Sequence, residues 1–126
     1  MSSKQYFTTS KFVKELSPKD FDSVVSSKLK SGECTAILFY ANYCPWCHKM
    51  KDAWEEFAEM AAFYNVAAFD CATHTAHSAK IKDELPLLIP SFPNIVFYKD
   101  GKPSETYDGD RTASAFLKAC MRVCGK

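Results

Sequence analysis

Residues 35–41 form an unbroken run of apolar, β-branched and aromatic side chains. Such a run is typical of a strand that is buried on both faces of a sheet. Three residues later the chain reads Cys44-Pro45-Trp46-Cys47, and residues 49–64 follow without a glycine or a proline. Apolar residues recur there every three or four positions, which predicts a long amphipathic helix. A buried strand that leads through a CxxC motif directly into a helix restricts the fold more than any other feature of the chain.

The remaining sequence predicts further strands and helices in alternation. Four more strands are predicted, at residues 12–16, 66–69, 94–98 and 104–107. Asp100-Gly101 indicates a hairpin turn between the last two of them. Three more helices are predicted, at residues 17–31, at residues 75–85 and after Thr112. The first of these helices is expected to bury Phe21, Val24, Val25 and Leu29. This order predicts an α/β fold with a mixed central sheet and helices on both faces.

The size and charge of the chain limit the classes of function. A chain of 126 residues is expected to form one domain, residues 1–126, with residues 1–10 as a flexible N-terminal extension. A formal net charge of +1, without a basic stripe, argues against a nucleic-acid partner. We see no signal peptide and no apolar run of about 18 residues, so we expect a cytosolic protein without a membrane partner.

The CxxC motif is expected to be chemically active because of its position. Cys44 would lie at the N-terminus of a helix, where unpaired backbone N–H groups favour the thiolate form. A spacing of two residues spans one helical turn, so Cys47 can reach the Cys44 sulfur. Cys44 is therefore the expected nucleophile, and the less accessible Cys47 is expected to resolve the mixed disulfide.

Three other sites could use the same cysteines. Cys44 to His48 has the spacing of a c-type haem attachment site, although the strand-rich pattern disagrees with such domains. His74 and His77 could complete a zinc site with the two cysteines, but a single CxxC with this histidine gap fits the usual spacings poorly. An iron–sulfur cluster shared by two subunits is the third alternative.

Three landmarks in order resemble the thioredoxin superfamily, and within it the domains of protein disulfide isomerases. They are the segment from Phe39 to Lys49 around the CxxC motif, Phe92-Pro93 before a predicted hairpin, and Tyr107-x-Gly109-x-Arg111-Thr112. The resemblance implies a thioredoxin-like three-layer sandwich with a cis Pro93 that faces the Cys44–Cys47 pair. It also implies a substrate-binding surface made by Tyr43, Pro45, Trp46, Phe92 and Pro93.

The sequence also departs from this family at a buried pair of charges. The family places a buried acid six residues before the first cysteine and pairs it with a lysine on the next strand. Leu38 and, in our alignment, Ala68 occupy these positions, so both charges are missing together. Arg111 matches an arginine that is thought to lower the pKa of the second cysteine, and a plain surface arginine is the alternative interpretation.

The resemblance implies a thiol–disulfide oxidoreductase that acts on protein or peptide disulfides and needs a reductant, such as a reductase or glutathione. We expect a monomer without a cofactor or metal. A glutathione-dependent, glutaredoxin-like enzyme and a partner-binding module with a redox switch are the alternatives. The other four cysteines are expected to be small apolar residues, with a regulatory disulfide as the alternative: Cys34, Cys71, Cys120 and Cys124.

Overall fold

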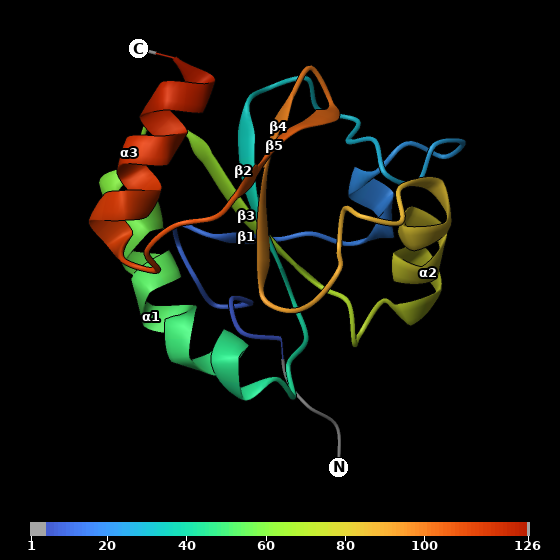
Figure 1. Ribbon diagram of the computed structural model, residues 1–126, viewed down its shortest axis with the longest axis horizontal. Helices are drawn as coiled ribbons and strands as arrows, with labels where there is room; N and C mark the ends of the chain where they lie inside the picture. Colours follow the sequence, from blue (N-terminus) through green and yellow to red (C-terminus); the bar gives the residue numbers. More distant parts are fainter. Residues whose placement is uncertain (1–4, 126) are drawn as a thin grey trace.

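The computed structural model describes residues 5–125, which fold around a five-stranded mixed sheet. Its strands are β1 (Lys14–Glu15), β2 (Thr35–Tyr40), β3 (Asn65–Asp70), β4 (Asn94–Lys99) and β5 (Lys102–Tyr107). Its helices are α1 (Pro45–Met60), α2 (Thr75–Glu84) and α3 (Ala113–Cys124). The spatial strand order is β1-β3-β2-β4-β5. Helices α1 and α3 cover one face and α2 covers the other, so the predicted three-layer architecture is confirmed (Figure 1).

Strand β2 lies in the middle of the sheet because its sequence can be buried on both sides. It runs parallel to β3 and antiparallel to β4, and all six of its residues are buried. Leu38 and Tyr40 belong to the core on the α1 and α3 side, whereas Ile37 and Phe39 belong to the core on the α2 side. The buried strand ends at Tyr40, and the chain then turns into α1 at Pro45.

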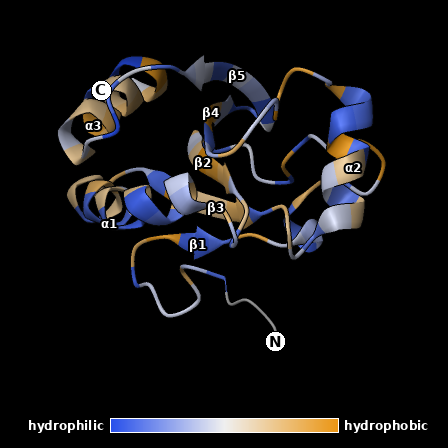
Figure 2. Ribbon diagram, turned by 60° about the horizontal axis from the view of Figure 1, so that its bottom comes forward, coloured by the Kyte–Doolittle hydropathy of each residue, from blue (hydrophilic) through white to orange (hydrophobic). Residues whose placement is uncertain are grey.

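Helices α1 and α3 pack against each other through aromatic side chains. The ring centroid of Trp54 lies 4.9 Å from that of Phe57 and 5.3 Å from that of Phe116 on α3. The Trp54 indole N–H also donates to the Ala67 carbonyl at 3.2 Å. In Figure 2 the ribbons of both helices carry hydrophobic and hydrophilic residues in turn, as expected of amphipathic helices. In residues 5–125 no helix is long and apolar enough to span a membrane.

The predicted hairpin between β4 and β5 is confirmed, and its turn requires residues that tolerate positive φ. Asp100 has a φ of 54° and Gly101 a φ of 81°. Both values suit a tight hairpin turn. A Cβ atom on Gly101 would also lie only 2.8 Å from the Leu29 carbonyl oxygen. A glycine is therefore needed here for two separate reasons.

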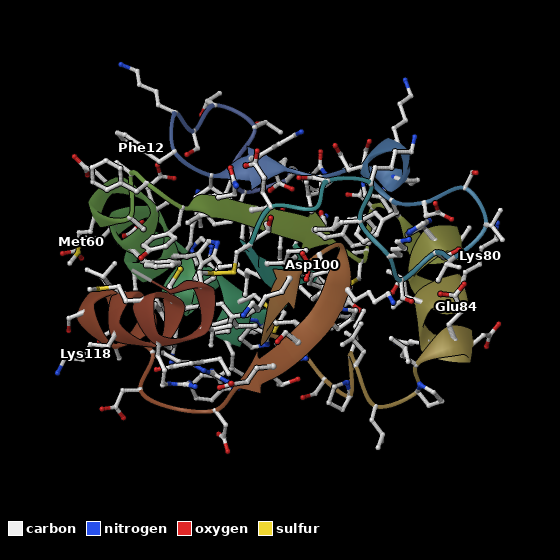
Figure 3. All side chains as sticks on the ribbon, turned by 90° about the horizontal axis from the view of Figure 1, so that it is seen from above. Phe12, Met60, Lys80, Glu84, Asp100 and Lys118 are labelled. Atoms are coloured by element: carbon white, nitrogen blue, oxygen red, sulfur yellow. A yellow bond between two sulfur atoms is a disulfide. The ribbon has the colours of Figure 1, made fainter. Side chains whose placement is uncertain are left out.

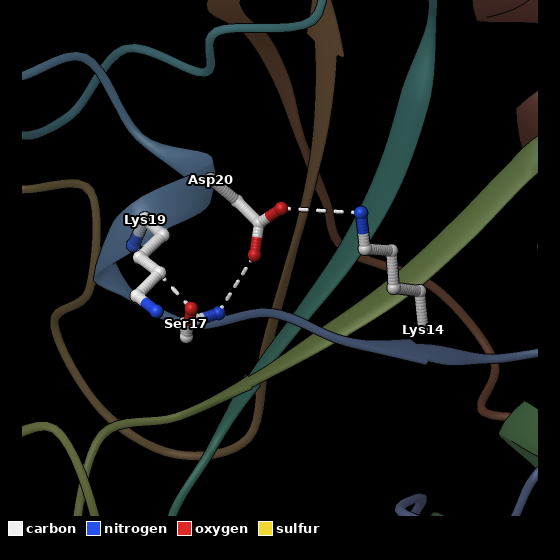
Figure 4. Close-up of polar contacts among 4 residues, drawn as sticks. All are labelled: Lys14, Ser17, Lys19 and Asp20. Atoms are coloured by element: carbon white, nitrogen blue, oxygen red, sulfur yellow. Dashed lines mark hydrogen bonds and ion pairs between the residues drawn. The ribbon is translucent and has the colours of Figure 1, made fainter.

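The helix predicted at residues 17–31 is wrong. The capping box forms, because the Ser17 N–H donates to Asp20 at 2.9 Å and the Ser17 hydroxyl accepts from the Lys19 N–H (Figure 4). The helix nevertheless stops after the single 3-10 turn Pro18–Asp20. Val24 is 83% exposed instead of buried.

A contact from a distant part of the chain explains this difference. The Glu84 carboxylate on α2 accepts hydrogen bonds from the backbone N–H groups of Ser26 and Ser27, at 2.8 and 2.7 Å. Residues 24–27 are two valines and two serines, which are poor helix formers. The segment therefore has little helical preference, and the Glu84 contact is enough to hold it in another conformation. The segment forms a loop that Glu84 holds against α2.

The flexible N-terminal extension predicted at residues 1–10 is also wrong for residues 5–10. Phe7 is 2% exposed, and the Tyr6 ring stacks on the Tyr40 ring with centroids 4.5 Å apart. The Tyr6 N–H donates to the Tyr40 hydroxyl at 2.9 Å. Residues 1–4 of the prediction lie outside the described residues. The N-terminal segment therefore contributes directly to the end of β2 that carries the site.

Candidate functional site

The Cys44–Cys47 pair lies where the carboxyl end of β2 leads into α1. Cys44 is the N-cap of α1, and Pro45 occupies the first helical position. The Cys44 N–H donates to the Ala41 carbonyl at 2.9 Å, which closes the turn. The Cys47 N–H donates to the Cys44 Sγ at 3.4 Å, a contact that stabilises negative charge on that sulfur. The turn and the helix start together fix the geometry of the two thiols.

The two thiols differ strongly in accessibility. Cys44 is half-buried, whereas Cys47 is fully buried, and neither forms a disulfide. Burial raises the pKa of the Cys47 thiol to about 12. The backbone N–H of Ala41 and the charge of the exposed Arg111 act in the opposite direction and lower this pKa, but burial has the larger effect. This arrangement allows Cys44 to react with a substrate first. Cys47 is shielded from the substrate and can react only with Cys44.

The segment before β4 faces the Cys44 sulfur. The Phe92–Pro93 peptide bond is cis, as the family resemblance implies. The Cys44 thiol lies 3.9 Å from the Phe92 carbonyl oxygen, to which it can donate a weak hydrogen bond. Tyr43 and Trp46 are 71% and 60% exposed, so apolar surface surrounds the reactive sulfur. The geometry thus places exposed aromatic side chains and the Phe92 backbone carbonyl beside the nucleophile.

A groove of about 310 Å³ extends from this surface toward α2. Tyr43 and Phe92 form the side near the cysteines, and Lys82 forms part of the far side. The Lys82 ammonium lies 5.6 Å from the centre of the Phe92 ring. The groove can therefore accept an apolar side chain and place a cation beside it.

The positions of the missing acid and lysine lie opposite each other in the sheet. Leu38 on β2 pairs directly with Ala68 on β3, and Ala68 pairs with Glu15 on β1. The three residues form one row across the sheet, so the carboxylate of this row stands on β1 instead of β2. The Glu15 carboxylate accepts hydrogen bonds from the Tyr40 hydroxyl and, at 3.0 Å, from the Phe7 N–H. No local pattern predicts this row, because strand register depends on pairing between distant segments.

Glu15 and Tyr6 have shifted pKa values. Burial raises the pKa of Glu15 to about 7, although hydrogen bonds from Tyr40 and from the Phe7 backbone oppose the shift. Burial also raises the pKa of Tyr6 to about 12, and the charges of Cys47 and Cys44 contribute to that shift. The N-terminal segment therefore lies within electrostatic reach of both site cysteines.

The other four cysteines fall into two groups. Cys71 and Cys120 are buried free thiols, as expected of small apolar residues. Cys34 and Cys124, however, form a disulfide with Cα atoms 5.6 Å apart, so their assignment as plain apolar residues is wrong. They are 90 residues apart in the sequence. No pattern in the sequence predicted that the end of α3 would reach the start of β2.

The three histidines of the chain lie in different surroundings. His48 is in the first turn of α1, with its ring 5.9 Å from the Tyr6 ring. His74 and His77 pack against Phe69 on the α2 side of the sheet. Within the described part of the chain, no group of three or more His, Cys, Asp or Glu side chains is arranged to hold a metal ion.

Comparison with known proteins agrees with this geometry. The thioredoxin family model matches residues 12–122. Protein disulfide-isomerase like 2-2 of Arabidopsis thaliana is 29% identical over 111 residues, which cover 87% of this chain and 23% of that protein. Protein disulfide-isomerase A3 of Gallus gallus is 25% identical over 114 residues, which cover 90% of this chain and 21% of that protein.

A solved structure, the J-Trx1 fragment of ERdj5, matches the fold with a TM-score of 0.70 at 24% identity, over 89% of this chain and 51% of that one. The chain spans about a quarter or less of the curated relatives it matches. The match nevertheless includes the CxxC turn, the cis-proline segment and most of α3. On this evidence the chain belongs to the thioredoxin family and resembles the domains of protein disulfide isomerases.

Proposed function

We propose that this chain is a thiol–disulfide oxidoreductase that acts on disulfides in protein substrates. One observation carries the proposal: the accessible Cys44 sulfur receives the Cys47 N–H at 3.4 Å, in front of a buried free thiol that can replace the substrate. Relatedness to protein disulfide isomerases supports the same chemistry and favours protein disulfides over the glutathione-dependent alternative.

The reaction requires two exchanges. The Cys44 thiolate attacks one sulfur of the substrate disulfide, which forms a mixed disulfide and releases the first substrate thiolate. The Cys47 thiolate then attacks the Cys44 sulfur, which forms the Cys44–Cys47 disulfide and releases the second substrate thiolate. Two electrons have passed to the substrate, and both leaving thiolates take up protons from water. A dithiol reductase or glutathione must then return two electrons to the pair.

The apolar surface around Cys44 favours extended or unfolded clients. The Phe92 carbonyl faces the reactive sulfur, and Tyr43 and Trp46 are exposed beside it. An extended substrate strand could donate an N–H to this carbonyl and place its side chains on the aromatic rings. The chain would act as a monomer, with exchange rather than tight binding as its function.

We propose separately that the protein acts in an oxidising compartment. A cytosolic location stays a prediction from the sequence alone. The Cys34–Cys124 disulfide favours a more oxidising compartment, because such bonds are rarely kept in the reducing cytosol.

Insulin reduction with single-cysteine variants tests the proposed activity. We expect Cys44→Ser to abolish turnover and Cys47→Ser to accumulate a mixed disulfide between Cys44 and insulin. Cys120→Ala removes a buried free thiol on α3, away from the pair and its groove, and is the matched control, which should keep its activity. Full activity of Cys44→Ser would overturn the proposal.

A further inference from the structure

The Cys34–Cys124 disulfide lies at the opposite end of the molecule from the Cys44–Cys47 pair. Cys34 directly precedes β2, whereas Cys44 follows that strand. A six-residue strand is about 20 Å long, so the two sites of one molecule are too far apart for direct exchange. Figure 1 shows the same separation, with the first turn of α1 at one end and the last turn of α3 at the other. Any exchange between the two sites must therefore join two molecules.

The Cys34–Cys124 bond borders an open groove of about 640 Å³. Both cysteines are half-buried rather than buried, and both line the groove. Three large apolar side chains on its rim are exposed, namely Met60 at 45%, Phe63 at 97% and Met121 at 46%. Met60 points outward at the end of α1 in Figure 3. Exposed apolar surface of this kind marks a contact site for another protein.

The charges on α1 favour a particular partner for this groove. The helix carries basic side chains near the Cys44 end and acidic side chains toward the groove, which is the reverse of what the helix dipole prefers. The basic residues are His48, Lys49 and Lys51, and the acidic ones are Asp52, Glu55, Glu56 and Glu59. Among the described residues that line the groove, only Glu33 is charged. The basic, apolar Cys44 end of one molecule is thus complementary to the groove of another, which is apolar and carries one acidic side chain, Glu33.

We propose that Cys34–Cys124 is a second redox site, and that its reaction partner is the Cys44–Cys47 pair of another copy of this chain. The proposal rests on the proposed oxidoreductase function. The contact is heterologous, because it joins two different surfaces of identical chains. Tyr43 and Trp46 of one copy meet Phe63, Met60 and Met121 of the other.

The exchange follows the ordinary chemistry of thiols. The Cys44 thiolate of one copy attacks the Cys124 sulfur of the other, which forms an intermolecular disulfide and releases the Cys34 thiolate. The Cys47 thiolate of the first copy then forms the Cys44–Cys47 disulfide and releases the Cys124 thiolate. The first copy is oxidised by two electrons and the second is reduced by two. In the opposite direction, an oxidised Cys44–Cys47 pair installs the Cys34–Cys124 bond and ties the end of α3 to the start of β2.

Two complementary variants test the exchange. Cys44→Ser/Cys47→Ser keeps only the second site, and Cys34→Ala/Cys124→Ala keeps only the first. The variants are mixed without oxygen in both directions, with either site oxidised at the start, and mass spectrometry follows each disulfide. We expect transfer in at least one direction, with a rate constant at least tenfold higher than for dithiothreitol at equal thiolate concentration. Transfer no faster than dithiothreitol in both directions would overturn the proposal.

Substitutions on the surface test the docking. Phe63→Ser and Glu33→Lys should each slow transfer by at least threefold, and 0.5 M salt should slow it relative to 0.05 M. Val24→Ser is the matched control, because Val24 is an 83% exposed apolar residue outside the groove lining, and it should leave the rate unchanged. Equal rates for Phe63→Ser and Val24→Ser would contradict the assigned groove.

A second measurement covers the case in which a double variant folds poorly. Cys34→Ser, which leaves the Cys124 thiol free, is mixed with Cys47→Ser whose Cys44 carries a thionitrobenzoate group. Release of the coloured thiolate should accompany a Cys44–Cys124 bond found by peptide mapping, whereas bonds between two Cys44 residues alone would overturn the proposal.

Insulin reduction by the Cys34→Ala/Cys124→Ala preparation used above separates the second redox site from the proposed function. If this variant reduces insulin but exchanges no disulfide with the second site of another copy, the second redox site is overturned and the proposed function stands.

Discussion

The Cys47 N–H donates to the Cys44 Sγ at 3.4 Å, while the Cys47 thiol itself is fully buried behind that sulfur. The backbone of one cysteine thus supports the reactivity of the other before the two thiols ever exchange. Because burial raises the pKa of Cys47 to about 12, its thiol is protonated at neutral pH until a mixed disulfide changes its surroundings.

This difference predicts selective alkylation. In reduced protein at pH 8, iodoacetamide should modify Cys44 at least tenfold faster than Cys47. Peptide mass spectrometry after short reaction times measures both rates. The urea-unfolded chain is the control, and there the two cysteines should react alike. Equal rates in the folded protein would contradict the burial of Cys47.

Arg111 is expected to assist Cys47 through its charge. The Arg111 charge lowers the pKa of the Cys47 thiol, so Arg111→Gln should raise that pKa further and slow resolution of the mixed disulfide about two- to threefold at pH 7. Stopped-flow Trp46 fluorescence in a single turnover measures this step.

The matched control for this variant is Arg122→Gln. Arg122 is also an exposed arginine on the α3 side, but it pairs with Glu105 at 2.6 Å, so its loss should not change the resolution rate. If the resolution rate is unchanged in Arg111→Gln as well, Arg111 is a surface arginine without a role in the reaction of Cys47.

Glu15 predicts an unusual dependence of stability on pH. Its pKa is raised from 4.5 to about 7 by burial, so the folded state holds this proton more tightly than the unfolded chain does. Stability from this group is complete below about pH 4.5 and is lost as the pH rises to about 7, by at most about 3 kcal/mol. Urea unfolding from pH 4.5 to pH 8 should therefore show a smaller decline in Glu15→Gln than in the unmodified protein.

Glu56→Gln, which changes an exposed carboxylate on α1, should reproduce the pH dependence of the unmodified protein. A Glu15→Gln variant whose free energy of unfolding declines as steeply as that of the unmodified protein would refute a protonated Glu15.

The Cys34–Cys124 bond should contribute strongly to stability. It closes a loop of 90 residues, and chain-entropy arguments assign such a cross-link about 3–5 kcal/mol in the free energy of unfolding. Cys34→Ser/Cys124→Ser should lose that amount in urea denaturation. Reductant should destabilise the unmodified protein but leave the double variant unchanged. A reductant effect of equal size in both would show that the bond is not the cause.

The elements with a strong local pattern could be predicted from the sequence. Residues 35–41 and 49–64 carry dense apolar patterns, and β2 and α1 lie there with small shifts at their ends. The helix expected after Ser17 failed because Glu84, far along the chain, binds the backbone that the helix would have used. A correct capping signal can therefore start a helix without determining its length.

The residues of the site also fall into those with a local sequence pattern and those placed by distant contacts. Cys44, Cys47 and Pro93 belong to short motifs that can be recognised in one sequence, and the structure brings them together. Glu15 reaches the site row only through the pairing of β1 with β3, and the packing of α3 against α1 places Cys124 beside Cys34. Both relationships depend on tertiary structure and leave no local pattern in the chain.

The most direct test of the central claim is a redox titration of the Cys44–Cys47 pair. The protein is equilibrated in glutathione buffers of graded ratio, the thiols are alkylated, and peptide mass spectrometry measures the fraction of Cys44 joined to Cys47. We predict a two-electron transition between a free dithiol and one intramolecular disulfide, at about −120 to −270 mV. A pair that stays reduced at every ratio, or that forms only bonds between two molecules, would contradict the account.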